Sequence, residues 1–264
     1  MSNHSFAVVA YKDSPYLEEC LKSLQRQSYQ SSIMVFTSTP SSYIESMCNN
    51  LNVRMEINPH RASIAEDWSF AFNRSSTKYV TLAHQDDIYM PEYAQICMNS
   101  MNESKKKVLL IFTNYREILD NSMVRALSPA LFVKRILLNT ASMFGSGFNS
   151  IFTKKMLLSL GNMVSCPTVM YNKELIGEFN FSSAYSYNLD WDAWLRFSDM
   201  DGAYRYIKRP VVSHRIHSSS ETNAHIMSEN RRKEEKDIFR RIWPYPIADI
   251  ISFMYAFGSR SSKV

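Results

Sequence analysis

Short apolar runs alternate with amphipathic stretches over about the first 115 residues of the chain. The apolar runs lie at 6–11, 33–37, 53–57 and 79–83, and the amphipathic stretches follow Ser14, Tyr43 and Ser63. A run that is apolar throughout is typical of a strand covered on both faces, and apolar residues recurring every three or four positions indicate a helix. This alternation predicts an α/β fold with a mostly parallel central sheet flanked by helices.

The pattern is less regular after residue 115. We expect further strands at 105–114, 166–171, 204–207 and 211–216, and helices at 131–138, 151–160 and 188–197. Ser63 and Glu66 form a capping-box pattern, Pro15 and Pro91 suit first helical turns, and Asp190 suits the cap of the last helix. The chain is divided into a main domain, 1–222, with halves at 1–115 and 116–222, and a helical C-terminal extension, 223–264.

Composition sets outer limits on the function. The 264 residues are 45% hydrophobic and 21% charged, which is typical of one large globular domain. A net charge of +5 suits an anionic substrate or a membrane surface and is weak evidence for nucleic acid, so we expect no nucleic-acid partner. The sequence contains neither GxGxxG nor GxxxxGK[ST], which argues against a nicotinamide site and a P-loop.

The four cysteines are far apart and form no zinc pattern, so they predict buried thiols. No secretory signal and no apolar run of about 18 residues are present, which favours the reduced cytoplasm.

The clearest chemical signal is the sequence His84-Gln85-Asp86-Asp87 directly after an apolar run. Two adjacent carboxylates at the end of a parallel strand repel each other, and ligands bind at that edge of such sheets. One interpretation is a divalent cation that carries a phosphorylated ligand. The other is a solvated turn in which Asp87 lies near a helix start.

Five motifs in order resemble the family 2 glycosyltransferases, which have the GT-A fold, and the resemblance spans roughly residues 5–220. The motifs read FAVVAYKDSPYLEECLKSLQRQSY, LAHQDDIYMPEY, CPTVMYNKELI, NLDWDAWLRF and HRIHSSS. They resemble the first strand and helix, the DxD-type metal motif, the stretch before the acceptor site, the helix of the catalytic base and the late Arg-X-His turn.

The resemblance implies an inverting transferase that moves a sugar from a nucleotide-diphosphate sugar, most simply a UDP-sugar, to a hydroxyl group. It assigns Asp190 as the general base and Asp86, Asp87 and His217 as ligands of Mn²⁺ or Mg²⁺, with the imidazole favouring Mn²⁺. Nucleotide or substrate contacts are expected from Ala10, Tyr11, Thr37, Asp67, His84, Gln85, Trp191 and Arg215.

Several of these assignments have alternatives. Asp190 is also an ordinary helix cap, in which case Asp192 becomes the candidate base. Trp191 is either a sugar platform or part of the core, Trp194 is expected in the core, and Arg196 is expected to pair with a carboxylate. Two departures from the family pattern also matter: His84 stands where an aspartate is usual in the metal motif, and Thr37 where an aspartate often reads the base.

The tail combines a mixed-charge helix (SENRRKEEKDIFRR) with an apolar segment, residues 243–258. The second part predicts contact with a membrane interface, with its own domain or with a second subunit. We expect a glycan or lipid-linked acceptor, a role in polysaccharide biosynthesis and a place in the cytoplasm, at the inner face of the membrane in the lipid-linked case. A silent binding protein or a nucleotidyltransferase on a similar sheet are the alternatives.

Overall fold

The computed structural model describes residues 2–60, 62–119, 123–125, 128–143, 147–217 and 229–260. The N-terminal half alternates strictly between strands and helices. Its elements are β1 (His4–Val9), α1 (Leu17–Gln25), β2 (Ser32–Thr37), α2 (Ser42–Asn50), β3 (Arg54–Ile57), α3 (Ile64–Arg74) and β4 (Tyr79–His84). The predicted order of strands and helices in this half is confirmed, and Ser63 and Glu66 form the predicted capping box of α3.

The second half adds shorter strands and the C-terminal helices. Its elements are β5 (Ile88–Tyr89), α4 (Tyr93–Asn102), β6 (Val108–Ile118), α5 (Pro129–Met143), β7 (Gly147–Phe148), α6 (Ile151–Leu158), a 3₁₀ turn at Cys166–Thr168, β8 (Val169–Asn172), α7 (Lys173–Ile176), α8 (Leu189–Ser198), β9 (Ala203–Arg215), α10 (Glu229–Ile242) and α11 (Tyr245–Arg260). Residues 229–242 and 245–260 are therefore helical, as expected for the C-terminal extension. The division into domains stays a prediction.

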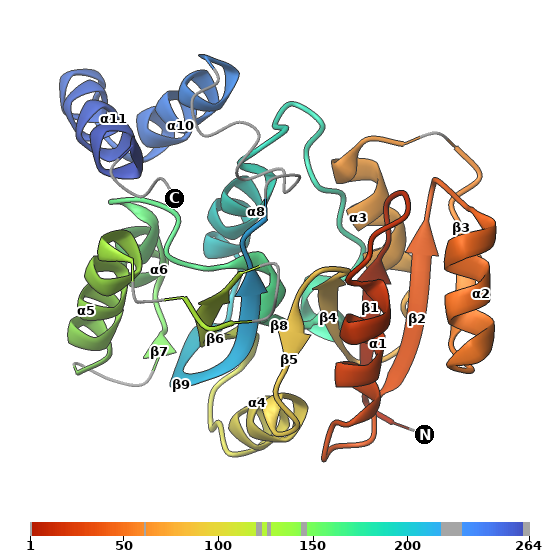
Figure 1. Cartoon of the computed structure of the whole chain (residues 1–264). Coiled ribbons are helices and arrows are strands. Elements are labelled where there is room, and N and C mark those ends of the chain that lie inside the picture. Colours follow the sequence, from red (N-terminus) through yellow and green to blue (C-terminus); the bar gives the residue numbers. More distant parts are fainter. Residues whose placement is uncertain are drawn as a thin grey trace.

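The nine strands of the described residues join one sheet, in the order β3-β2-β1-β4-β8-β6-β9-β5, with β7 paired to β9. Strands β1 to β4 are mutually parallel, β8 runs antiparallel between β4 and β6, and β6 is parallel to β9. Figure 1 shows this sheet at the centre, with helices on both faces. The predicted α/β fold with a central sheet flanked by helices is confirmed.

Two separate apolar layers cover the sheet. One contains residues of α3, α8 and α10, among them Trp68, Trp194 and Phe239. The other contains residues of α1 and α4, among them Leu21 and Tyr93. All four cysteines are free and buried, as the sequence predicts.

Local sterics change some predicted boundaries. Helices α1 and α4 begin at Leu17 and Tyr93, so Pro15 and Pro91 precede the helix caps instead of lying in the first turns. The two strands predicted at 204–207 and 211–216 form one strand, β9, whose register against β6 shifts at Pro210 because proline has no N–H to donate. The strand predicted at 166–171 begins only at Val169, because Cys166–Thr168 forms a 3₁₀ turn with Pro167 at its start.

Candidate active site

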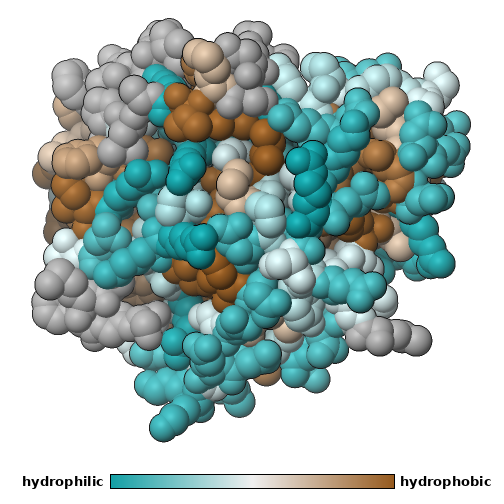
Figure 2. Space-filling view, turned by 60° about the horizontal axis from the view of Figure 1, so that its bottom comes forward, coloured by the Kyte–Doolittle hydropathy of each residue, from teal (hydrophilic) through white to brown (hydrophobic). Residues whose placement is uncertain are grey.

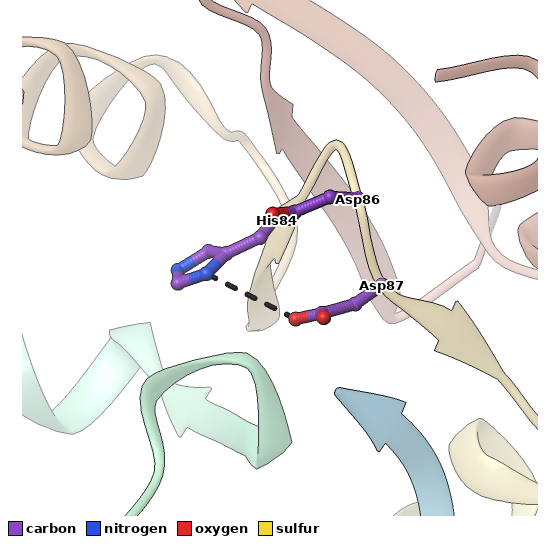
Figure 3. A group of neighbouring side chains, drawn as sticks. All are labelled: His84, Asp86 and Asp87. Atoms are coloured by element: carbon purple, nitrogen blue, oxygen red, sulfur yellow. Dashed lines mark ion pairs between the residues drawn. The ribbon is translucent and has the colours of Figure 1, made fainter. Parts of the chain in front are cut away.

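The HQDD stretch forms the turn between β4 and β5 (Figure 3). The N–H of Asp87 donates to the carbonyl of His84 at 3.3 Å, which closes the turn. His84 is the last residue of β4 and pairs in register with Val9, the last residue of β1. The turn therefore lies at the carboxyl edge of the parallel strands, where the sequence places a ligand site.

Asp87 is fully buried and is held by β9. Its Oδ1 atom accepts the backbone N–H of Arg215 at 2.9 Å and lies 2.9 Å from Nδ1 of His214. Its Oδ2 atom has no hydrogen-bond partner among the described residues and lies 3.9 Å from Nδ1 of His84. A buried carboxylate oxygen without a partner is unfavourable, so this atom is suited to a bound cation.

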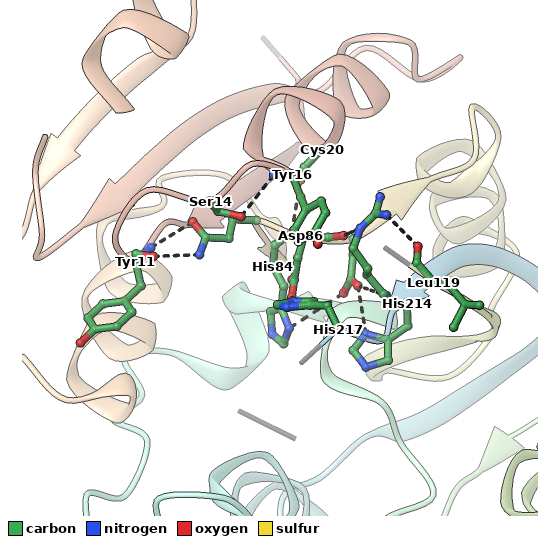
Figure 4. Close-up of polar contacts among 12 residues, drawn as sticks. Tyr11, Ser14, Tyr16, Cys20, His84, Asp86, Leu119, His214 and His217 are labelled. Carbon is green, nitrogen blue, oxygen red and sulfur yellow. Dashed lines mark hydrogen bonds and ion pairs between the residues drawn. The ribbon is translucent and has the colours of Figure 1, made fainter. Parts of the chain in front are cut away.

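Asp86 faces His217, with Oδ2 of the carboxylate 2.9 Å from Nε2 of the imidazole (Figure 4). Burial would raise the pKa of Asp86, but the hydrogen bond from His217 and the nearby imidazoles outweigh it and lower that pKa. The imidazole of His217 in turn lies against the ring of Tyr16, at 5.0 Å between centroids. Asp86 is therefore an anionic carboxylate that one imidazole already contacts.

Arg215 lies beneath the turn and is buried. Its Nε donates to the carbonyl of Asp86 at 2.9 Å, Nη1 donates to the carbonyl of Leu119 at 3.0 Å, and Nη2 pairs with Glu19 at 2.6 Å. The guanidinium also lies over the ring of Tyr16, 4.4 Å from its centroid. Arg215 therefore fixes the backbone of the turn, and its donors are used within the protein instead of pointing to a phosphate.

Four of the residues predicted to contact the nucleotide lie at the carboxyl ends of β1, β2 and β4: Ala10, Tyr11, Thr37 and Gln85. The Gln85 amide exchanges two hydrogen bonds with the backbone of Tyr11, at 3.1 and 2.9 Å. Thr37 is buried and accepts the N–H of Thr39 at 3.0 Å. Ala10 is buried and donates its N–H to the carbonyl of Phe36 at 2.9 Å, so only its backbone is suited to a ligand contact.

Asp67 belongs to the same region. It lies in the first turn of α3 and accepts hydrogen bonds from Ser38 at 2.6 Å and from Asn58 at 3.0 Å. The residues that follow β2 and β3 thus hold this buried carboxylate beside Thr37, where the family often has an aspartate.

Asp190 lies in the first turn of α8, but the helix cap is Asn188, so the predicted capping role of Asp190 is wrong. Its Oδ1 accepts the N–H of Trp191 at 2.7 Å, and its Oδ2 accepts Nδ2 of Asn162 at 2.8 Å. Burial raises the pKa of Asp190, and the hydrogen bonds from Asn162 and the Trp191 N–H offset only part of this effect. A carboxylate with a raised pKa is a stronger proton acceptor than an exposed one.

Asp192 is already neutralised by arginines. It is buried and pairs with Arg241 at 2.6 Å and with Arg196 at 3.5 Å. The second pair is the contact that the sequence predicts for Arg196. Asp192 therefore pairs with guanidinium groups, whereas Asp190 accepts hydrogen bonds from an amide and a backbone N–H.

The structure contradicts the prediction of a sugar platform at Trp191. The indole is fully buried and packs edge-on against Phe239, at 5.0 Å between centroids, and against Tyr255. Helix α8 is covered on this side by α10 and α11, so the ring has no open face. Trp194 is also buried, as expected, and donates its indole N–H to the carbonyl of Val164.

Sequence reasoning missed the residues by which α10 holds the loop before α8. The carboxylate of Glu234 accepts the backbone N–H groups of Ser186, Tyr187 and Asn188, at 2.7, 3.0 and 3.1 Å. Glu234 lies in a mixed-charge run that resembles an ordinary solvated helix, and the sequence carries no signal for this contact.

Three imidazoles and two carboxylates thus surround one turn, and His84, Asp86 and Asp87 each offer a ligand atom within 4.8 Å of the others. Oxygen ligands suit Mg²⁺ and Mn²⁺, and the nitrogen ligands favour Mn²⁺. The partnerless Oδ2 of Asp87 supports this fit. Two of the three predicted ligands, Asp86 and Asp87, belong to this group, and His84 is its third member. The third predicted ligand, His217, contacts Asp86.

A mostly parallel sheet flanked by helices, with an acidic turn at the carboxyl edge of its parallel strands, is the architecture of GT-A glycosyltransferases. The chain belongs to glycosyl transferase family 2, whose sequence model matches residues 5–161, more than half of the chain. Comparison with curated protein sequences gives no match.

Solved structures share the fold. S. aureus TarS 1-349 in complex with UDP-GlcNAc is 14% identical, with a TM-score of 0.62, and 99% of this chain covers 73% of it. The mannosyltransferase PcManGT from Pyrobaculum calidifontis, in complex with GDP-Man and Mn²⁺, is 12% identical, with a TM-score of 0.61 and coverage of 98% and 72%. Against the longer TarS structure the TM-score is 0.60, and the chain spans 43% of that protein's length. These identities show the fold alone.

Replacing Arg215 by Met tests its role beneath the turn. The variant loses the bonds to Asp86, Leu119 and Glu19, so we expect the free energy of unfolding to fall by about 3 kcal/mol or more. Glu19→Gln is the matched control, because the amide keeps an acceptor and Glu19 is partly exposed; it should cost less than about 1 kcal/mol. Urea denaturation of both variants gives the comparison, and equal stabilities would contradict the structural role of Arg215.

Replacing Glu234 by Ala frees three backbone N–H groups before α8. We expect a loss of about 2 kcal/mol in stability and faster amide hydrogen exchange at residues 186–188. Glu229→Ala, at the exposed start of α10, is the control and should change neither quantity. Unaltered exchange at 186–188 in the Glu234 variant would show that the loop holds its shape without the Glu234 carboxylate.

Proposed function

We propose that this protein is an inverting glycosyltransferase that transfers a sugar from a UDP-sugar to a hydroxyl group of a glycan or lipid-linked acceptor. The observation that carries the proposal is the group formed by His84, Asp86 and Asp87 at the carboxyl edge of the sheet, together with the carboxylate of Asp190 on α8. Membership of glycosyl transferase family 2 supports the reaction class.

Asp86 and Asp87, with His84 or His217, would hold Mn²⁺ or Mg²⁺ on the donor side. When bound, the ion neutralises the negative charge that grows on the departing diphosphate. Asp86 is suited to this role because its lowered pKa keeps it ionised. TarS has been solved with UDP-GlcNAc and PcManGT with GDP-Man and Mn²⁺, which supports a nucleotide-sugar donor of this general kind.

The nucleoside would lie over the ends of β1 and β2. Tyr11 presents an exposed ring there, and Gln85 fixes the backbone of that residue. Thr37, Ser38 and Asp67 offer hydroxyl and carboxylate groups for the base, and Asp67 stands in for the aspartate that is missing after β2. Uracil, which presents both an N–H donor and carbonyl acceptors, suits such a mixed set.

The transfer step requires one proton acceptor. The acceptor hydroxyl oxygen forms a bond to the anomeric carbon as the bond from that carbon to the diphosphate oxygen breaks. The hydroxyl proton passes to the carboxylate of Asp190, and the electron pair of the broken bond leaves with the diphosphate. Attack from the face opposite the diphosphate inverts the anomeric configuration. Asn162 and the Trp191 N–H orient the carboxylate without neutralising it.

The acceptor side includes the C-terminal helices, because α10 fixes the loop that leads into α8. A lipid-linked acceptor in polysaccharide biosynthesis would place the enzyme in the cytoplasm at the inner face of a membrane. The extension would then contact that membrane or a second subunit. No helix in the described part of the chain is long and apolar enough to cross a bilayer.

The reaction itself is tested by incubating the full chain with a panel of nucleotide sugars, with and without Mn²⁺. We expect release of a nucleoside diphosphate from at least one UDP-sugar, and more of it with Mn²⁺. Nucleotide binding without release of nucleoside diphosphate from any donor would instead support a silent binding protein. The presence of His84 at the position where an aspartate is usual in the metal motif favours that alternative.

Asp86→Ala tests metal-dependent nucleotide binding. Removing one anionic ligand should weaken the affinity for UDP in the presence of Mn²⁺ by roughly tenfold or more, because ion and diphosphate bind together. Calorimetric titration of wild type and variant, each with Mn²⁺ and with EDTA, measures this. Equal UDP affinity in all four titrations would remove the metal from the proposal.

Asp190→Asn tests the base while preserving shape. The new amide oxygen can still accept the Trp191 N–H, and its NH₂ group can donate to Asn162 if the Asn162 amide rotates. Folding and UDP affinity should therefore survive. Release of nucleoside diphosphate should fall by a factor on the order of 10² or more. Asp192→Asn is the comparison: it should lower stability through Arg241 and change the rate less.

The pH dependence gives a second test of Asp190. A base works only when deprotonated, and the pKa of Asp190 is raised above its ordinary value. The wild-type kcat/KM should therefore fall as the pH drops through a pKa higher than that of an exposed carboxyl group, and Asp190→Asn should lack this acidic limb. A retained acidic limb in the variant would assign the base to another group.

A further inference from the structure

The last helix, α11, turns aromatic side chains both outward and inward. The coloured atoms of the face in Figure 2 are mostly hydrophilic, with hydrophobic atoms gathered along the left edge, the side on which Figure 1 places α5 and α6. On α11, Phe253 is likewise exposed, whereas Tyr255 is partly buried and packs against the apolar layer that contains Trp194. The inward ring therefore lies against the part of the chain that carries the candidate base.

Three aromatic rings, one from each of α8, α10 and α11, pack together. The ring of Tyr255 lies 5.7 Å from that of Trp191 and 5.6 Å from that of Phe239, between centroids. The indole N–H of Trp191 is buried and has no hydrogen-bond partner among the described residues. Ring packing therefore holds this indole at the start of α8, where the backbone N–H of Trp191 donates to Asp190.

Tyr255 also contacts the segment that follows α6. A Cβ atom added at Gly161 would collide with the Tyr255 ring, and Gly161 has a φ of +145°, which residues with a side chain rarely adopt. Burial raises the pKa of Tyr255 to about 12, and a backbone hydrogen bond from Asn162 offsets part of that rise. The ring thus requires glycine at position 161, and the hydroxyl group reaches the backbone of the next residue.

The side chain of Asn162 depends on its backbone for its position. Its Nδ2 atom donates to Oδ2 of Asp190 at 2.8 Å, but its Oδ1 atom is buried and has no hydrogen-bond partner among the described residues. Within this part of the chain, the bond to Asp190 is therefore the one bond of the Asn162 amide. The backbone position decides whether Nδ2 points at the carboxylate, and Tyr255 lies against that backbone.

Other contacts fix α11 to α10 and to the main domain. Asp249 pairs with Lys236 of α10 at 2.9 Å. The indole N–H of Trp243, between the two helices, donates to the carbonyl of Ser159, directly after α6, at 2.8 Å. The helix that carries Tyr255 is thus docked by contacts that do not involve the Tyr255 side chain, so loss of its hydroxyl group should leave the helix in place.

We propose that Tyr255 is a positioning residue for the candidate base. Its ring packs on Trp191 and its hydroxyl group meets the backbone of Asn162. These are the two residues that donate hydrogen bonds to the carboxylate of Asp190. The role rests on the proposed function, because Asp190 is the base there. The C-terminal extension thereby helps to orient the carboxylate that takes the proton of the acceptor hydroxyl.

Tyr255→Phe tests this role, because it removes the hydroxyl group and keeps the ring. We expect kcat to fall by about tenfold, since a small displacement of a catalytic group is costly, and the KM of the donor to stay unchanged. Trp243→Phe is the matched control: it removes one hydrogen bond of the same extension but contacts neither Asn162 nor Trp191, and it should leave kcat near the wild-type value.

The pH dependence separates positioning from a general loss of structure. Burial raises the pKa of Asp190, and the hydrogen bond from Asn162 and the charges of Lys134 and His84 lower it. A weaker bond from Asn162 should therefore raise this pKa and move the acidic limb of kcat/KM to higher pH, by roughly half a unit or more. A substitution that only destabilises the fold would leave the limb at the same pH.

An NMR titration reports on Asp190 without any substrate. The carboxyl carbon resonance of Asp190 is identified by its absence in Asp190→Asn, and thermal unfolding shows that the variants fold. The titration midpoint should rise in Tyr255→Phe and stay unchanged in Trp243→Phe. An unchanged midpoint and an unchanged acidic limb in Tyr255→Phe, or equal shifts in both variants, would overturn the positioning role. Failure of the donor panel with a raised midpoint in Tyr255→Phe would reject only the transferase function.

Discussion

The buried carboxylate of Asp87 is the interaction on which the site depends. A charge removed from water must be compensated nearby, and here the compensation comes from β9, more than a hundred residues later. Burial alone would lower the pKa of His214, but Asp87 outweighs it and raises that pKa to about 9. The imidazole is therefore a cation at neutral pH, and the pair ties the turn after β4 to the end of β9.

This tie determines which atoms remain for a ligand. One oxygen of Asp87 is used by β9, and the other is left without a hydrogen-bond partner beside His84. Arg215 holds the carbonyl of Asp86 from below, so the side chain of Asp86 is free to point toward His217. The two adjacent carboxylates therefore differ: Asp87 is buried and holds the turn to β9, whereas the side chain of Asp86 is more exposed.

The fold could be predicted largely from the sequence because short apolar runs and helical periodicity are local signals. The order of strands in the first half, the capping box of Ser63 and the carboxylates at the end of β4 all follow from neighbours in the chain. The orientation of Trp191 could not be predicted, because α8 is covered on both sides and its second cover, α10, is distant in sequence. The role of Glu234 could not be predicted either. Its partners are also distant in sequence, and they are backbone N–H groups, which every residue except proline has.

The two aspartates of α8 show why sequence alone left the base open. Asp190 and Asp192 are two positions apart and chemically identical, and only their surroundings separate them. Asp192 forms ion pairs with Arg196 and Arg241. Asp190 receives an amide and a backbone N–H within a buried setting that raises its pKa. Because Arg241 comes from α10, a helix distant in sequence supplies the ion pair that distinguishes the surroundings of Asp192 from those of Asp190.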